Sequence, residues 1–256
     1  MSDTGYINSI ETLGALDGPG IRTVVFFQGC GLKCKFCHNP ECIEVGSGKE
    51  ISVDELYTLI IKNKPYFGKY EKGREIKGGV TFSGGEPTLQ SEFVANVAKK
   101  LRVEDIHLAI DSCLFTSSKN IESLIPEIDY WMVSIKHMDP AVHKELTGFE
   151  NNIILDNIKL LDSRISGLNS GVKIRIRYLL LPGITDTKDN IERLIEFLKS
   201  IKNLDCIEIL GYGSHAKDKW IKLFGKYELS DLPDATQDDI ERIASVFREN
   251  GFEVLY

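Results

Sequence analysis

Three cysteines stand close together near the start of the chain, in the stretch "CGLKCKFCHNP" that runs from residue 30 to residue 40. Three residues separate Cys30 from Cys34, and two separate Cys34 from Cys37. In a loop, this spacing lets all three sulfurs point inward, and thiolates so placed suit zinc or an iron–sulfur cluster. The chain begins without the basic and apolar segments of a signal peptide, so we expect a cytoplasmic protein, in which clustered cysteines bind metal more often than they pair.

The number of ligands separates two kinds of site. A closed zinc site or the cluster of an electron carrier takes four protein ligands, and Cys42 or His38 could supply the fourth. An open four-iron cluster instead keeps three cysteines and leaves its fourth iron for a small molecule. The spacing alone leaves both readings open.

The composition is that of an ordinary globular protein and limits the choice of partner. Of the 256 residues, 42% are hydrophobic and 27% are charged, and the net charge is −7. An acidic chain has no uniform basic field to gather nucleic acid or anionic lipid. No apolar run reaches the roughly 20 residues that span a bilayer. We therefore expect neither a nucleic-acid partner nor a membrane partner.

Apolar runs rich in β-formers alternate with segments of helical periodicity, a pattern typical of βαβ units and a parallel sheet. The predicted strands are 24–29, 78–85, 107–112, 130–136, 172–183, 206–212 and 252–256. The predicted helices are 52–63, which opens with the capping box Ser52-x-x-Glu55, 89–101, 153–161, 189–201 and 236–249. The expected fold class is α/β, a partial (β/α)6 TIM-like barrel with parallel strands. We expect one domain, 1–256, with a cluster loop at 30–37 and a small N-terminal strand extension at 1–20.

The unusual residues follow the ends of these strands. The cysteines follow the first strand, "SGGEP" (83–87) ends the second, Asp111 ends the third, Lys136 ends the fourth, and "GYGSH" (211–215) ends the sixth. In barrels of parallel strands, functional sites form where strands end and the next loops begin. Paired glycines also let a backbone approach a ligand closely. We therefore expect these residues on one rim.

At this point the sequence resembles a known family. "CGLKCKFCHN" (30–39) resembles the Cys-x3-Cys-x2-Cys signature of radical S-adenosylmethionine (SAM) enzymes, and "GGEP" (84–87) resembles their motif for the methionyl amine. "DGPGIRTVVFFQGC" (17–30), followed by "CHNP", is similar to the glycyl-radical-enzyme activases, most closely to their pyruvate formate-lyase branch. The likeness runs from residue 11 to the end of the chain. Several sister activases carry further cysteine clusters, whereas only Cys42 follows the triplet closely here, as in the single-cluster branch.

The resemblance implies a role for each residue of these motifs. Cys30, Cys34 and Cys37 would hold one [4Fe–4S] cluster, and SAM would bind its open iron. The residues that would bind SAM are Phe36, His38, Gly84, Gly85, Glu86, Asp111, Ser134 and Lys136. Among them, the "GGEP" residues would face the amine and Lys136 would pair with the carboxylate. Asp111 would hold the amine, or a monovalent cation beside the carboxylate.

The same resemblance implies a reaction and its partners. A flavodoxin or ferredoxin would reduce the cluster, SAM would be cleaved reductively, and a 5′-deoxyadenosyl radical would take a hydrogen from a glycine of a partner glycyl radical enzyme under anaerobic conditions. Asp17, Arg22 and Arg177 are expected to contact that partner's glycyl loop. The activase itself is expected to be a monomer that engages its partner transiently.

Three places depart from the family pattern. The aspartate of the third strand is followed by Ser112 and Cys113, where the family has Thr and then Asn-Gly or Ser-Gly. Ser134 stands where an aspartate is common, and Gly213 stands where close relatives have histidine, with His215 two positions later. Losing a polar contact in a buried site costs about 1–3 kcal/mol, unless water or His215 substitutes. We expect SAM cleavage to persist with altered contacts.

Two other functions stay open besides the activase. One is a radical SAM enzyme that acts on a small molecule or a peptide, and the other is an electron carrier or binding protein with a closed metal site. Cys206 is expected in the core, and Cys113 is expected either at the site or in packing. His107 and His143 are expected at the surface or at strand edges.

Overall fold

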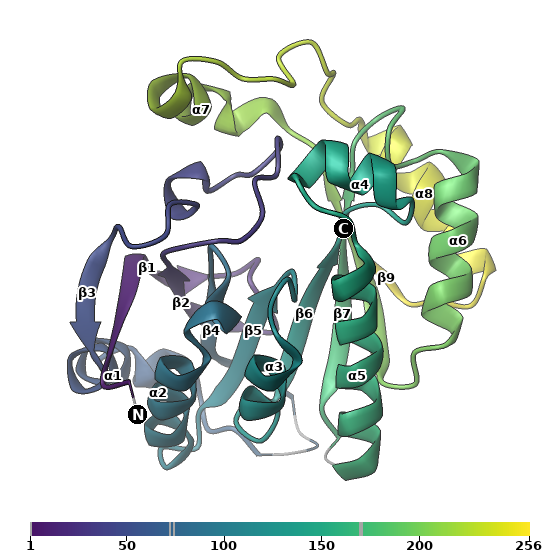
Figure 1. The fold of residues 1–256 in the computed structure, drawn as a ribbon. Helices are drawn as coiled ribbons and strands as arrows, with labels where there is room; N and C mark the ends of the chain where they lie inside the picture. Colours follow the sequence, from purple (N-terminus) through teal and green to yellow (C-terminus); the bar gives the residue numbers. More distant parts are fainter. Residues whose placement is uncertain (1, 72, 74, 169–170) are drawn as a thin grey trace. The chain divides into compact units, whose positions relative to one another are not determined.

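The computed structural model describes residues 2–71, 73, 75–168 and 171–256, which divide into two compact units. The first unit comprises Met1–Gly31 and Cys42–Met132, and the second comprises Leu32–Glu41 and Val133–Tyr256. The predicted cluster loop therefore belongs to both units, with its first cysteine in the first unit and the other two in the second. Figure 1 shows the strands and helices of each.

The first unit is built on a mainly parallel sheet. Its strands are β1 (Thr4–Gly14), β2 (Ile21–Phe27), β3 (Lys49–Ser52), β4 (Gly78–Gly84) and β5 (His107–Ser112). They lie in the order β3–β1–β2–β4–β5, with β1 antiparallel to both neighbours and β2, β4 and β5 parallel. Its helices are α1 (Val53–Ile61), α2 (Ser91–Arg102) and α3 (Ser118–Leu124), with the 3-10 turns η2 (Lys64–Tyr66) and η3 (Pro87–Gln90). In Figure 1, α2 lies between α1 and α3, and it contacts both.

Capping residues begin two of these elements. Ser52 accepts a hydrogen bond from the Glu55 N–H, and the Glu55 carboxylate accepts one from the Ser52 N–H, so the predicted capping box of α1 is confirmed. Glu86 stands before Pro87 and accepts a hydrogen bond from the Thr88 N–H at 3.0 Å, which caps η3. This second cap fixes the turn that follows β4.

The second unit is likewise built on parallel strands. These are β7 (Lys173–Leu180), β8 (Leu204–Gly211) and β9 (Val254–Leu255), paired in that order. Its helices are α4 (Pro140–Thr147), α5 (Asn152–Leu168), α6 (Lys188–Lys199), α7 (Lys217–Phe224) and α8 (Gln237–Glu249), with the 3-10 turn η4 (Ser214–Ala216). β6 (Tyr130–Ile135) and the 3-10 turn η1 (Pro40–Cys42) each have residues in both units. All six side chains of β6 are buried, as expected for an apolar strand inside a parallel sheet.

The predicted strands and helices are present, most with ends that shift by a few residues. β5 matches the predicted 107–112 at both ends, whereas α5 continues seven residues beyond the predicted 153–161. β1 lies within the expected strand extension 1–20. The short elements β3, α3, α4 and α7 were not predicted. Among the described residues, every helix is too short or too polar to cross a membrane.

Two histidines expected at the surface or at strand edges are buried, so the surface position is wrong for both. His107 and His143 are each 1% exposed. The His107 ring lies 4.9 Å from the Tyr70 ring centre, edge to face. His143 Nδ1 lies 2.6 Å from the Phe149 carbonyl oxygen at the end of α4. Ring packing and backbone hydrogen bonds therefore take both imidazoles into the interior.

Candidate active site

The first end of the cysteine loop is fixed to the first unit by backbone hydrogen bonds. The Gly29 N–H donates to the Cys42 carbonyl at 2.8 Å, and the Cys30 N–H donates to the Ile43 carbonyl at 3.0 Å. Cys42 is buried at 1% exposure, whereas Cys30 is partly exposed. The segment that returns from the loop therefore holds Cys30 through its backbone and keeps the side chain of Cys42 in the interior.

The glycine pair at the end of β4 packs against this loop. The Glu86 N–H donates to the Gly29 carbonyl at 2.8 Å. A β-carbon on Gly85 would lie 2.3 Å from the Gly29 carbonyl oxygen and 2.7 Å from the Cys42 carbonyl oxygen. Gly84 has a φ of +106°, a conformation that favours glycine. The glycines were expected to let the backbone approach a ligand closely. In the structure, the absence of a side chain at Gly85 lets the backbone of the cysteine loop pack against it.

The Glu86 carboxylate is buried and accepts hydrogen bonds from five neutral donors. Oε1 accepts from the Thr88 N–H at 3.0 Å, the Thr88 hydroxyl at 2.6 Å and the Ser112 hydroxyl at 2.7 Å. Oε2 accepts from the Cys113 N–H at 2.8 Å and the Cys113 thiol at 2.9 Å. A buried carboxylate needs such donors. Because Glu86 is 0% exposed, its predicted place facing a ligand amine gains no support from this arrangement.

Cys113 links Glu86 to the first predicted cluster ligand. Its thiol hydrogen-bonds the side chain of Cys30 as well as Glu86. The pKa of the Cys113 thiol is raised well above its ordinary value, first by the hydrogen bond to Cys30, then by burial and by the charge of Glu86. Of the two places expected for Cys113, the structure favours the one at the cysteine loop. Nothing in its own sequence neighbourhood could have shown this contact.

Asp111 lies near the end of β5, next to these residues in the chain. Its side chain is partly exposed, and its Oδ2 accepts a hydrogen bond from the Ser83 hydroxyl at 3.3 Å. Ser83 precedes the glycine pair on the neighbouring strand β4. The first unit therefore brings together Cys30, the "GGEP" turn, Asp111 and the two departures that follow it.

The second end of the cysteine loop is fixed to α4. The Lys33 N–H donates to the Thr147 carbonyl at 2.8 Å, and the Lys35 N–H donates to the Leu146 carbonyl at 2.9 Å. Phe36 is 4% exposed and packs in an apolar cluster with Leu146. The last turn of α4, an element that sequence analysis did not predict, therefore positions Cys34 and Cys37.

Lys136 and Phe36 lie together in the second unit. The Lys136 Nζ is 5.6 Å from the centre of the Phe36 ring, within the range of a cation–π contact. Lys136 follows the last residue of β6 and is partly buried, and Ser134, two positions earlier, is 9% exposed. The ring thus places the ammonium group beside the cysteine loop.

His38 lies among basic groups of the same unit. Its pKa is lowered chiefly because it is partly buried; a hydrogen bond with the Gly213 backbone opposes this, and His215, Lys136 and Lys219 lower the pKa further. A β-carbon on Gly213 would lie 2.8 Å from His215 Cδ2. The His215 ring thus takes the space that a side chain at position 213 would need. The imidazole of His215 therefore lies close to position 213, where close relatives have a histidine.

Helix α7 holds the cysteine loop from another side (Figure 1). The Trp220 Nε1–H donates to the Cys37 carbonyl at 2.9 Å, and the Lys219 Nζ donates to the His38 carbonyl at 3.1 Å. Lys219 also pairs with Glu41 at 2.7 Å. The segment 220–229, from which sequence reasoning derived no chemistry, therefore supports the third cysteine. The exposed apolar residues between its lysines were the available signal.

Arg22 was expected to contact a partner, and the structure corrects this, because its side chain is 0% exposed. Its Nε donates to the Thr81 hydroxyl at 3.0 Å, and its Nη1 donates to the Pro19 carbonyl at 3.2 Å. The Thr81 hydroxyl donates in turn to the Asp17 carbonyl at 2.6 Å. Arg22 thus supports the turn that follows Asp17 from the inside. The side chain of Asp17 is partly exposed, so its contact with a partner stays a prediction.

His107 completes this buried group. Its Nδ1 lies 3.1 Å from Arg22 Nη1, and because a guanidinium only donates, the imidazole accepts here. Burial first, and then the charge of Arg22, lower the pKa of His107 to about 3. His107 is therefore neutral at physiological pH.

Arg177, also expected near a partner, is held by an ion pair within the second unit. Its Nε lies 2.8 Å from Glu208 Oε2, across the β7–β8 pair. Arg175 Nη1 lies 3.5 Å from the other oxygen of the same carboxylate. The three side chains are 11–13% exposed. A contact between Arg177 and a partner stays a prediction.

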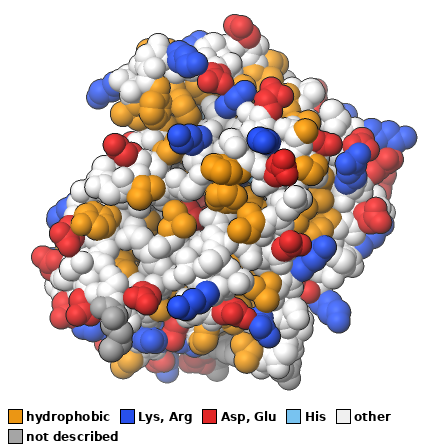
Figure 2. Space-filling view, viewed as in Figure 1, with side chains coloured by type: hydrophobic (Ala, Val, Ile, Leu, Met, Phe, Trp, Pro, Cys, Tyr) orange, Lys and Arg blue, Asp and Glu red, His pale blue; other side chains and the backbone are white. Residues whose placement is uncertain are grey.

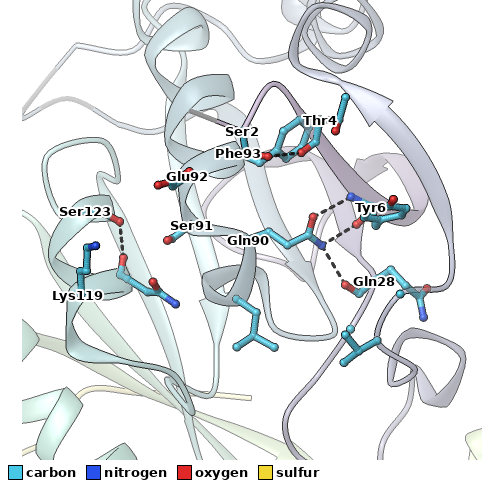
Figure 3. A pocket seen from close by; sticks show the side chains of 15 residues that line it. Ser2, Thr4, Tyr6, Gln28, Gln90, Ser91, Glu92, Phe93, Lys119 and Ser123 are labelled. Atoms are coloured by element: carbon cyan, nitrogen blue, oxygen red, sulfur yellow. Dashed lines mark hydrogen bonds between the residues drawn. The ribbon is translucent and has the colours of Figure 1, made fainter.

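A pocket of about 600 Å³ opens in the first unit, between β1, η3 and α3. Figure 3 shows the Gln90 amide reaching toward β1: its Oε1 accepts from the Tyr6 N–H at 2.7 Å, and its Nε2 donates to the Tyr6 carbonyl at 2.8 Å and the Gln28 carbonyl at 2.9 Å. None of the predicted ligand or cofactor residues lines this pocket. Its best-placed amide is thus occupied in joining η3 to the sheet.

The donor set at the cysteine loop fits an iron–sulfur cluster. Cys30, Cys34 and Cys37 are present as thiols, and all three are partly exposed. Three thiolates in one loop are ligands of the kind that such clusters use. As placed, no group of three or more His, Cys, Asp or Glu side chains in the described ranges could hold a metal ion. The fit to a cluster therefore rests on the three thiols being suitable ligands and not on their arrangement in this structure.

Comparisons with known proteins agree with this chemistry. Residues 24–198 match the sequence profile of the Radical SAM superfamily. The chain is 38% identical to the pyruvate formate-lyase-activating enzyme of Clostridium pasteurianum, over 96% of this chain and 98% of that protein. It is 33% identical to the pyruvate formate-lyase 1-activating enzyme of Escherichia coli (strain K12), over the whole of both.

Solved structures show the same fold. A domain of pyruvate-formate lyase-activating enzyme from Bacteroides vulgatus is 25% identical with a TM-score of 0.56, over 69% of this chain and 97% of that one. Streptococcus suis SuiB bound to S-adenosylmethionine is 16% identical with a TM-score of 0.63, over 91% of this chain and 50% of that one. The expected fold class, the α/β fold of a partial (β/α)6 TIM-like barrel with parallel strands, is confirmed. Radical SAM proteins use a [4Fe–4S] cluster and SAM, and this chain belongs to their superfamily, in the family of pyruvate formate-lyase-activating enzymes.

Proposed function

We propose that this protein is a radical SAM activase. It cleaves SAM reductively at a [4Fe–4S] cluster and takes a hydrogen atom from a glycine of a glycyl radical enzyme of the pyruvate formate-lyase type. The observation that carries the proposal is the likeness to pyruvate formate-lyase-activating enzymes over 96–100% of the chain, with the cysteine triplet intact. The bound cluster and SAM supply the radical chemistry, and the protein binds, orients and shields them.

In this proposal Cys30, Cys34 and Cys37 would hold the cluster, and SAM would bind at its remaining open position. Lys136 pairs with the SAM carboxylate, for which a compact ammonium is suited. The cation–π contact with Phe36 supports this role because it holds the ammonium beside the loop. Cys34, Cys37 and Lys136 thus belong to one unit.

The other assignments follow the family motifs. His38, Asp111 and Ser134 complete the contacts with SAM, and the glycine pair at 84–85 with Glu86 shapes the side of its amine. Weaker roles fall to Ser112, Gly213 and His215, and a monovalent cation binds near Asp111. Asp17 and Arg177 face the glycyl loop of the partner, and Arg22 acts through the turn that it supports.

The reductant is an acidic redox protein such as a flavodoxin or ferredoxin, and α7 offers a surface for it. Residues 217–226 hold four lysines and one aspartate, in a chain whose net charge is −7. Ile221, Leu223 and Phe224 are 44–50% exposed, and Figure 2 shows hydrophobic side chains gathered over α7 with basic ones beside them. Complementary charge steers such encounters. The Trp220 contact with the Cys37 carbonyl brings this surface to the cluster loop.

In this proposal the protein acts as a monomer in the cytoplasm. The domain is taken as the whole chain, 1–256, because its relatives match over this length.

The test is an activation assay in the absence of oxygen. The reconstituted protein, SAM, a reductant and pyruvate formate-lyase are mixed, and electron paramagnetic resonance (EPR) follows the glycyl radical while chromatography follows 5′-deoxyadenosine. We expect the glycyl radical and 5′-deoxyadenosine in equal amounts. With a partner whose radical glycine is replaced by alanine, we expect no glycyl radical and no stoichiometric 5′-deoxyadenosine. 5′-Deoxyadenosine without a radical on the partner would favour another substrate. No 5′-deoxyadenosine at all would contradict the proposal.

A further inference from the structure

The carbonyl groups at the end of helix α4 hold the second part of the cysteine loop. The last four carbonyls of an α-helix have no partner within the helix. In α4, the Leu146 carbonyl accepts instead from the Lys35 N–H at 2.9 Å. The Thr147 carbonyl accepts from the Lys33 N–H at 2.8 Å. The place of this loop segment therefore depends on how firmly the end of α4 is held.

A buried imidazole holds that end. His143 lies within α4, and its Nδ1 is 2.6 Å from the carbonyl oxygen of Phe149, two residues past the helix. The Thr147 hydroxyl lies 3.1 Å from the same nitrogen and 2.8 Å from the His143 carbonyl oxygen. Between them, Gly148 ends the helix in a left-handed conformation, with a φ of +92°. His143 thus ties the turn that follows α4 back to the helix.

The polar contacts of the His143 ring run through Nδ1. A carbonyl oxygen only accepts, so Nδ1 carries the proton and donates it to Phe149. Nε2 is buried and makes no hydrogen bond to any other residue that the structure describes. Burial lowers the pKa of His143, the hydrogen bond with the Phe149 backbone opposes this, and the charges of Lys136 and His137 lower the pKa further. The ring is therefore neutral at pH 7, with its one N–H directed at Phe149.

The same helix end packs against a residue that is proposed to lie beside SAM. Leu146 is 3% exposed and belongs to the apolar cluster that contains Phe36. The Phe36 ring in turn has the Lys136 Nζ 5.6 Å from its centre. A movement of the end of α4 would therefore move the loop around Cys34, and with it the ring that faces Lys136.

We propose that His143 is a positioning residue of the active site, whose Nδ1–H fixes the end of α4 and thereby the loop segment 33–37 and the pair of Phe36 and Lys136. The part that concerns SAM rests on the proposed function, because it takes Lys136 as a residue that binds SAM. His143 acts through the turn that it holds. Its loss should therefore loosen the second end of the loop and leave the first end in place.

The first experiment compares His143→Leu with His143→Asn in the full chain before the cluster is reconstituted. The two replacement side chains have nearly the same shape, but only asparagine has an N–H donor close to the place of Nδ1. Amide hydrogen exchange followed by NMR reports the opening of individual hydrogen bonds. In His143→Leu we expect the Lys33 and Lys35 amides to exchange about two- to tenfold faster, the range for the loss of one hydrogen bond. In His143→Asn we expect exchange near the wild-type rate.

Two controls separate this effect from a general loss of stability. The Gly29 and Cys30 amides are bound within the first unit, so their exchange should stay at the wild-type rate in both His143 variants. Thr236→Val removes the hydroxyl that accepts from the Asp239 N–H at 3.1 Å and caps α8, elsewhere in the second unit. It should leave the exchange of the two lysine amides unchanged. Equal acceleration at both ends of the loop, or the same acceleration in Thr236→Val, would overturn the inference.

The second experiment measures the SAM affinity of the reconstituted proteins by anaerobic calorimetry. His143→Leu should bind SAM about two- to tenfold more weakly than the wild type, and His143→Asn should recover the affinity. Faster exchange of the lysine amides without a loss of SAM affinity would overturn the positioning role and leave the activase proposal standing.

The remaining outcomes keep the two proposals distinct. If the His143 variants do not fold, nitrogen NMR of the wild-type imidazole decides: we expect a proton on Nδ1 and none on Nε2 at pH 7, and the opposite tautomer would overturn the inference. A wild type that takes up no four-iron cluster would contradict the proposed function and the part of this inference that concerns SAM. The exchange rates would then still test whether His143 fixes the loop.

Discussion

The two ends of the cysteine loop are held in different ways. In the first unit, backbone hydrogen bonds to Cys42 and Glu86 fix Gly29, and Gly85 packs where no β-carbon fits. In the second unit, the Lys33 and Lys35 N–H groups donate to the end of α4, and the side chains of Trp220 and Lys219, on a partly exposed helix, donate to the carbonyls of Cys37 and His38. Backbone contacts alone hold the first end, whereas the second end depends in part on side chains, which can turn. The first end should therefore be the less tolerant of change.

Two of the three departures from the family pattern follow this division. In the first unit, Ser112 and Cys113 both donate to the buried Glu86 carboxylate, so the changed residues still satisfy a charge. In the second unit, Gly213 leaves room that the exposed His215 ring fills. A buried end thus accepts only residues that keep its hydrogen bonds, and an exposed end accepts a group supplied from a neighbouring position.

The largest effect is expected from an alanine at the tight glycine. Gly85→Ala would place a β-carbon 2.3 Å from the Gly29 carbonyl oxygen, and overpacking of this kind costs about 3 kcal/mol or more where backbone must move. Gly213→Ala is the matched control, because the atom in its way belongs to the exposed His215 ring. Thermal unfolding and iron content measure both. A Gly85→Ala protein as stable as Gly213→Ala would break the comparison.

The next effect concerns SAM binding at the second end. Lys136→Met should weaken SAM binding about 10- to 100-fold, because a hydrogen bond to a charged group contributes about 1.5–3 kcal/mol. Lys159→Met is the control, since Lys159 makes a similar contact of 5.7 Å with the Phe197 ring elsewhere in the unit. Anaerobic calorimetry gives both affinities. Equal affinity in Lys136→Met and wild type would remove Lys136 from the site.

The third prediction concerns the pH dependence of stability that the buried His107 of the first unit causes. The pKa of His107 is about 3 in the folded chain and about 6.5 when unfolded, so below pH 6.5 the unfolded chain binds a proton that the folded chain does not. The free energy of unfolding should therefore decrease as the pH is lowered from 6.5, by up to about 1.4 kcal/mol per pH unit from His107 alone. His107→Gln should unfold with a shallower slope between pH 6.5 and 5. Identical slopes in chemical denaturation would show that His107 is not held neutral.

The smallest effect tests the exchange between positions 213 and 215. His215→Ala should weaken SAM binding about two- to tenfold, the range expected for one hydrogen bond between neutral groups. The double variant Gly213→His, His215→Ala returns the imidazole to the family position and should recover the affinity. No loss in the single variant would mean that His215 fills space without serving the site.

The sequence predicts the framework of the fold better than the elements that hold the loop. The long strands and helices have clear periodicity, and β5 was predicted at both ends. α4 was missed although local signals were present: Asp139 caps it, Pro140 opens it and Gly148 ends it in a left-handed conformation. Its eight residues are too few for periodicity to stand out. Capping residues are the better signal for such helices.

The candidate site divides in the same way. The spacing of the cysteines and the family motifs identified residues that lie together within each unit. They could not show that Arg22 is buried, because "DGPGIR" reads as an exposed turn until its guanidinium is seen to bind Thr81 and Pro19. They could not show that Cys113 meets Cys30 either. Contacts between distant segments depend on packing, which periodicity does not record.

The most direct test of an open cluster in this chain is EPR of the reconstituted, reduced protein before and after SAM is added, with 5′-deoxyadenosine measured in the same sample. We predict four irons and four sulfides per chain, a reduced-cluster signal that changes shape on adding SAM, and formation of 5′-deoxyadenosine. An intact cluster with an unchanged signal and no product, or zinc without sulfide, would contradict the open cluster.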